Sequence, residues 1–121
     1  DISAKLFNLT ETDFGKLAVS LVDAATAMLG SPTVLVGAHP KAAYAASLIN
    51  ALRPKTKNVG IFGSFGWAGK MAEQLTNLLG NLKAETLQPL VSKGFPSDED
   101  FSAIDDLAEK ILASHTEAGI V

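Results

Sequence analysis

NVGIFGSFGWAG, residues 58–69, joins a short apolar run to a turn with glycine at every third position. The run Asn58–Phe62 is typical of a buried β-strand. The turn Gly63–Gly69 opens a helix predicted from Ala68 to Leu79, because its apolar residues recur on one helical face and a glycine follows it; these residues are Met71, Leu75, Leu78 and Leu79. A strand, a glycine-rich turn and a helix in this order indicate an α/β unit.

The same alternation extends to both sides of this stretch. Further strands are predicted at Ala4–Leu9, Ala24–Leu29 and Lys83–Val91, with Pro89 placing the last one at a sheet edge. Residues 30–40 are interpreted as a loop, because two prolines and two glycines interrupt them. The VLV sequence inside that loop can alternatively continue a strand.

Three more helices are predicted, over residues 10–24, 41–52 and 97–115. The first helix has an apolar stripe and a choice of capping residues, Thr10, Thr12 or Asp13; the stripe is Phe14, Leu17, Ala18, Leu21 and Val22. The second has Ala45, Leu48, Ile49 and Leu52 on one face. In the third, Ser97 and Asp100 form a capping box, and His115 is expected to face solvent in the last turn.

The resulting order is β-α-β-α-β-α-β-α over 121 residues, which is the length of one domain. Strands that alternate with helices favour a parallel sheet with helices on both faces. The predicted fold class is therefore α/β, a three-layer sandwich with four βα units. No internal repeat or linker divides the chain.

The composition excludes several classes of protein. Ten basic against thirteen acidic residues give a formal net charge of −3, which argues against binding to the nucleic-acid backbone. The chain has no cysteine and only two histidines, so disulfide scaffolds, iron–sulfur clusters and histidine-rich metal centres are excluded. No apolar stretch reaches the ~18 residues that span a bilayer. We expect a cytoplasmic domain without membrane contact.

Two segments follow the carboxyl ends of predicted strands, where ligands bind in sheets of this type. They are Gly30–Thr33 and Gly63–Gly69. Glycine lets a ligand approach the backbone, Phe65 and Trp67 offer flat apolar surfaces, and nearby hydroxyl groups can bond a polar edge; these belong to Ser31, Thr33 and Ser64. The combination predicts a planar heteroaromatic cofactor, against the alternatives of a plain tight turn and a tryptophan that only packs. Neither the dinucleotide nor the ATP glycine motif is present, and a structural role is favoured for His39.

Several stretches together resemble one family, the flavodiiron proteins or A-type flavoproteins, in their C-terminal flavodoxin-like domain. They are LGSPTVLVGAHP (29–40), NALRPKTK (50–57), IFGSFGWAGKMAEQL (61–75) and the strand and helix from Lys83 to His115. The G-S-[YF]-G-W-[GSA]-G loop is fairly specific for this family, and the G-[ST]-P-T loop is shared with flavodoxins. The resemblance covers nearly the whole chain.

The resemblance implies a flavodoxin-like domain over residues 1–121 that binds FMN and transfers electrons. It implies two cofactor-binding segments, Ser31, Pro32, Thr33 and Val34 in one, and Ser64, Phe65, Gly66, Trp67, Ala68 and Gly69 in the other. Phe65 stands where the family usually has tyrosine. The implied partners are a diiron domain of metallo-β-lactamase type, which reduces oxygen or nitric oxide, and a rubredoxin-like electron donor, in a homo-oligomer.

The sequence departs from the family at its start. The strand predicted at Ala4–Leu9 matches the family's second strand, so we expect an N-terminally incomplete domain without the first βα unit and its phosphate loop; a start at Asp1 rather than methionine agrees with this. The sheet is then expected to have a gap, and FMN binding by this chain is doubtful. Two histidines cannot form a diiron site, so no catalysis is expected from the chain alone. The alternative function is a cofactor-free fragment or interaction domain that pairs through an exposed sheet edge.

Overall fold

The sheet is built around the strand that the opening stretch predicts. The computed structural model describes residues 4–34, 37–52, 54–66, 70–80 and 82–119. Its elements follow the chain in this order: α1 (Phe14–Leu21), β1 (Thr26–Val34), β2 (Gly37–Ala38), α2 (Pro40–Leu52), β3 (Asn58–Phe65), α3 (Met71–Leu78), β4 (Glu85–Thr86), β5 (Leu90–Lys93) and α4 (Asp98–Glu117). The predicted alternation of strands and helices is confirmed from α1 onward.

Strand β3 lies between β1 on one side and both β4 and β5 on the other, all parallel to it. The single strand predicted at Lys83–Val91 is therefore wrong in extent. Residue 58 pairs with residue 85 in β4, but residue 62 pairs with residue 90 in β5, so one additional residue lies between the two short strands. Pro89 lies in this interval and cannot donate to the ladder, which explains why the pairing is interrupted.

The loop predicted over residues 30–40 is wrong for its first part, because β1 continues to Val34. The parallel ladder with β3 runs from Thr26 as far as Pro32, and Thr33 and Val34 then pair antiparallel with β2. Proline is tolerated here because it stands on a strand with little pairing on its other edge. The alternative interpretation, a continued strand, is thus supported for Val34, while residues 35–36 lie outside the described part.

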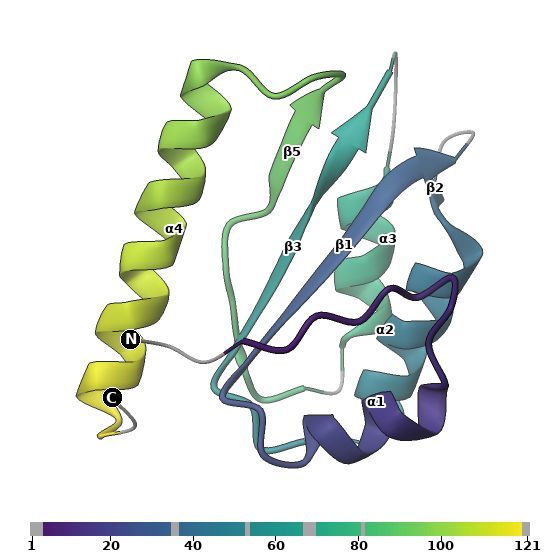
Figure 1. The fold of residues 1–121 in the computed structure, drawn as a ribbon, viewed down its shortest axis with the longest axis vertical. Coiled ribbons are helices and arrows are strands. Elements are labelled where there is room, and N and C mark those ends of the chain that lie inside the picture. Colours follow the sequence, from purple (N-terminus) through teal and green to yellow (C-terminus); the bar gives the residue numbers. More distant parts are fainter. Residues whose placement is uncertain (1–3, 35–36, 53, 67–69, 81, 120–121) are drawn as a thin grey trace.

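Ala4–Leu9 is not a strand, contrary to the prediction. Its alternating pattern is present, but no described strand lies beside it to form a ladder. The segment runs across the strands rather than along them (Figure 1, purple). Phe7 and Leu9 pack against the core instead.

Helices cover both faces of the sheet, as predicted (Figure 1). Helices α2 and α3 cover one face, and the main core lies there, formed by small residues of α2 and larger residues of β3 and α3; it includes Ala42, Ala45, Ala46, Ile49, Val59, Ile61 and Leu75. Alanines let α2 approach the sheet closely. Two residues of the predicted stripes, Val22 and Leu52, are exposed because they lie at the ends of their helices.

Helix α4 covers part of the other face. Its capping box is confirmed: the Ser97 N–H donates to Asp100 Oδ2 at 2.8 Å, and the Asp100 N–H donates to Ser97 Oγ at 3.3 Å. The expectation that His115 faces solvent is wrong, since its side chain is buried with Nε2 2.8 Å from Thr26 Oγ1. Asn58 Nδ2 donates to Ser114 Oγ at 2.9 Å, so these polar contacts fix the last turns of α4 to β1 and β3.

Candidate functional site

The two segments predicted to form one site lie side by side. Ser31 pairs with Gly63 and Pro32 with Ser64 at the carboxyl ends of β1 and β3. The Thr33 hydroxyl donates to the Ser64 carbonyl oxygen at 2.7 Å, which ties the two segments together. The two segments are therefore neighbours, although the described residues 31–34 and 64–65 belong to strands rather than to the loops that were predicted.

Gly63 is required for this close approach. A Cβ atom at this position would overlap the Ser31 carbonyl oxygen and come within 2.5 Å of Met71 Cε. Because the first obstacle is backbone, no side-chain rotation relieves it. The glycine therefore allows β1, β3 and the start of α3 to converge.

Ser31 is buried, and its hydroxyl is used within the protein. It donates to the Pro32 carbonyl oxygen at 2.7 Å and accepts from the His39 N–H at 2.9 Å. His39 in turn accepts the Lys41 N–H on Nδ1 at 3.1 Å, at the beginning of α2. These contacts give His39 the structural role that was favoured for it.

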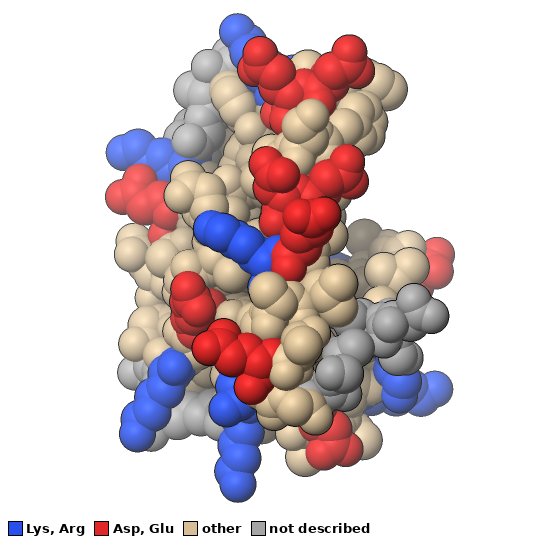
Figure 2. All heavy atoms as spheres, turned by 90° about the vertical axis from the view of Figure 1, so that its left-hand side faces the viewer, with Lys and Arg blue, Asp and Glu red and all other residues tan. Residues whose placement is uncertain are grey.

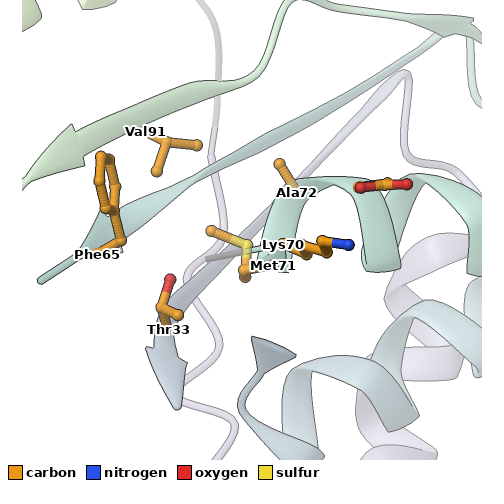
Figure 3. A pocket seen from close by; sticks show the side chains of 7 residues that line it. Thr33, Phe65, Lys70, Met71, Ala72 and Val91 are labelled. Atoms are coloured by element: carbon orange, nitrogen blue, oxygen red, sulfur yellow. The ribbon is translucent and has the colours of Figure 1, made fainter. Parts of the chain in front are cut away.

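A pocket of about 230 Å³ lies where the two segments meet α3 and β5. It is lined by Thr33, Phe65, Lys70, Met71, Ala72, Glu73 and Val91. Figure 3 shows the Phe65 ring beside Val91, with the Thr33 hydroxyl and Met71 directed toward the space near the ring. The Lys70 side chain extends away from the Phe65 ring. The pocket is thus lined by one aromatic ring, several apolar side chains, one hydroxyl group and two residues of opposite charge.

Sequence reasoning found part of this lining. Thr33 and Phe65 are predicted site residues, and Gly66 is exposed beside them. Trp67, Ala68 and Gly69 lie outside the described residues. The residues that were missed come from α3 and β5, where Met71 was assigned only to the core; they are Lys70, Met71, Ala72, Glu73 and Val91. The signal available for Lys70 and Glu73 was their position directly after the glycine-rich turn.

The charges near the pocket are balanced, but those of α4 are not. Lys70 and Glu73 contribute one charge of each sign at the pocket. Helix α4 carries seven acidic residues against Lys110, and acidic side chains gather along it in Figure 2. Within the described ranges, no three histidine or acidic side chains are grouped to hold a metal ion. No described helix is long and apolar enough to cross a membrane.

Comparison with known proteins connects this fold to one group of oxidoreductases. No protein-family model matches the chain. It is 36% identical over 93 residues to rubredoxin-oxygen oxidoreductase of Megalodesulfovibrio gigas, covering 74% of this chain and 22% of that protein. It is 30% identical over 114 residues to nitric oxide reductase of Moorella thermoacetica, covering 90% of this chain and 28% of the relative. The chain thus spans less than a third of the length of either relative.

Solved structures agree with the sequence relatives. Rubredoxin oxygen:oxidoreductase of Desulfovibrio gigas superimposes with a TM-score of 0.71 at 31% identity, over 78% of this chain and 24% of that one. A flavodiiron core from Synechocystis has the same fold, with a TM-score of 0.81 at 22% identity over 92% of this chain and 28% of that one. Sequence and fold together show that the chain matches the flavodoxin-like domain of the flavodiiron proteins.

Proposed function

We propose that the chain is the FMN-binding electron-transfer domain of a flavodiiron-type oxidoreductase. The observation that carries this is the meeting of the segments Ser31–Val34 and Ser64–Gly66 beside the Phe65 ring. An aromatic side chain next to aliphatic and hydroxyl groups, at the carboxyl ends of parallel strands, suits a planar heteroaromatic ring.

The residues around the pocket would contribute to FMN binding in different ways. Phe65 and Val91 would present apolar surface to the flavin ring and keep water from it. Thr33 fixes the spacing between β1 and β3, because its proton is donated to the Ser64 carbonyl oxygen. When bound, FMN supplies the one- and two-electron chemistry, while the protein supplies position and electrostatics.

The described pocket suits the flavin ring of FMN better than it suits the FMN phosphate group. The pocket is smaller than the roughly 300–1,000 Å³ of typical ligand sites. Among the described residues, Lys70 is the only cation that lines the pocket, Glu73 lines it as well, and no cluster of basic groups is present there. A phosphate is usually held by converging backbone N–H groups or by cations. We therefore expect this chain to bind FMN weakly and through its ring.

The names of the relatives suggest the wider role that we propose for this chain in electron transfer. One is a rubredoxin-oxygen oxidoreductase and another a nitric oxide reductase. We propose that electrons arrive from a rubredoxin-like donor and leave to a separate diiron domain that reduces oxygen or nitric oxide. A cytoplasmic location and a homo-oligomeric assembly belong to the same proposal.

Titration of the 121-residue chain into riboflavin and into FMN tests the proposal. We expect both fluorophores to be quenched with similar affinity, because the phosphate adds little. Phe65→Ala should weaken both affinities about tenfold, and Phe95→Ala, at an exposed site outside the pocket, should change neither. Absence of quenching would contradict ring binding. A much tighter complex with FMN would contradict the weak phosphate contact.

A further inference from the structure

A glutamine side chain of α3 holds the short strand β2. The Ala38 N–H donates to Gln74 Oε1 at 2.9 Å, and α3 packs against β2. In an antiparallel pair, every second residue turns its N–H away from the partner strand. Ala38 can therefore pair with Thr33 of β1 while its N–H bonds to α3. Because Ala38 is buried, its N–H would be costly to leave in place without an acceptor.

Gly37 leaves the space that the Gln74 side chain occupies. A Cβ atom at position 37 would lie 2.5 Å from Gln74 Oε1, so a side chain there would displace the amide group. Gln74 is otherwise exposed to solvent. The hydrogen bond to β2, rather than burial in the core, therefore holds the Gln74 side chain in place.

This contact completes a series of links around the pocket. On the β1 side, Thr33 donates to the Ser64 carbonyl oxygen and pairs with Ala38. Gln74 joins Ala38 to α3, and its own N–H donates to the Lys70 carbonyl oxygen at 2.8 Å, which closes the first turn of that helix. Lys70 and Thr33 both line the pocket. Two sides of the pocket are thus connected through one exposed side chain.

The backbone N–H groups around the start of α2 are used within the protein. The Ala38 N–H bonds to Gln74, and the His39 N–H donates to Ser31 Oγ at 2.9 Å. The Lys41 N–H donates to His39 Nδ1 at 3.1 Å. With these donors satisfied by side chains, they are not free to bind an anion. The contact of Gln74 therefore serves to hold the chain in place rather than to prepare a ligand site on α2.

We propose that Gln74 is a positioning residue for the flavin ring. It does not line the pocket, so it acts through Ala38 and Thr33 by fixing the distance between the end of β1 and the first turn of α3. Without the acceptor, the Ala38 N–H would turn to water and β2 would shift with it. A planar ring needs both sides at a fixed spacing, because dispersion contacts weaken steeply as a gap opens. The inference rests on the proposed function, since it concerns the same pocket.

Quenching of riboflavin measures the effect, because riboflavin carries the ring without a charged phosphate. In the 121-residue chain, Gln74→Leu should lower riboflavin affinity about fivefold, while the urea midpoint barely moves because the change is local. Gln74→Glu keeps an acceptor for the Ala38 N–H, so its affinity should stay within about twofold of the parent. Gln88→Leu is the matched control. It makes the same substitution at another exposed site that does not line the pocket, and it should change neither quantity.

Amide hydrogen exchange, measured by NMR without flavin, tests the contact directly. The Ala38 N–H should exchange about tenfold faster or more in Gln74→Leu, and as slowly as in the parent in Gln74→Glu. The positioning role would be overturned by equal Ala38 exchange in all three chains, or by equal losses of riboflavin affinity in the two variants. It would also be overturned if Gln74→Leu bound riboflavin as tightly as the parent. A parent chain that does not quench riboflavin would overturn the proposed function itself, and this inference with it.

Discussion

The two faces of the sheet differ in how completely they are covered. On the face covered by α2 and α3, Leu29 of β1 and Ile61 of β3 are buried. On the face that carries α4, Met28 and Phe62 remain substantially exposed, although they belong to the same two strands. We call the face under α2 and α3 the finished face, because it is fully packed. The face that carries α4 is the unfinished face, because it is only partly covered. The difference teaches that local strand formation does not require both faces to be packed.

The largest expected effect tests the finished face. Leu75→Ala should lower the free energy of unfolding by about 3 kcal/mol, because it removes a fully buried side chain and leaves a cavity. Urea denaturation of the parent and variant chains measures this. A loss below about 1 kcal/mol would show that the interior under α3 is as loosely packed as the opposite face.

The next effect tests the polar contacts that hold α4. Asn58→Ala should cost about 2 kcal/mol, because Asn58 is buried and its side chain donates to Ser114. Asn77→Ala is the control at an exposed helical site, and its midpoint in urea should barely move. If both variants unfolded at the same urea concentration, the anchoring role of Asn58 would be refuted.

A smaller effect tests the local support of α4. Ser97→Ala should cost about 1 kcal/mol through loss of the capping box. Because α4 buries few residues, this loss should appear as faster hydrogen exchange in its first turn. Ser102→Ala, on the exposed side of the same helix, should not accelerate exchange there.

The smallest effect tests the unfinished face. Leu112→Ala should change stability by no more than about 0.5 kcal/mol, since the side chain is already 42% exposed. The same urea measurement applies. A cost comparable to that of Leu75→Ala would mean that Leu112 is buried in solution, and the contrast between the faces would disappear.

Local signals predicted the helices well. Ser97 and Asp100 specify the start of α4 by themselves, and Asp13 caps α1 by accepting the Gly15 N–H at 2.8 Å. Strand extent was harder, because it depends on partners distant in sequence. Ala4–Leu9 has a strand pattern without a partner, while β1 passes through Pro32 because β3 continues beside it.

The candidate site was only partly predicted, because it also depends on contacts between residues that are distant in sequence. Thr33 and Ser64 were assigned to the same site, and a hydrogen bond joins the Thr33 hydroxyl to the Ser64 carbonyl oxygen. Val91 and Ala72 were not expected, since only the packing of β5 and α3 brings them to Phe65. His115 was misplaced because its contact with Thr26 spans 89 residues of sequence. The roles of Trp67, Ala68 and Gly69 remain predictions.

The additional residue between β4 and β5 determines to which face of the sheet the following side chains point. Side chains alternate between the two faces of a sheet, so one inserted residue reverses the assignment of everything after it. Thr86 pairs with Val59, and Val91 pairs with Gly63, which places both on the α3 face despite their odd separation. An unbroken strand from Thr86 would have turned Val91 away from the Phe65 pocket. The length of the segment around Pro89, more than its composition, thus decides which side chains reach the site.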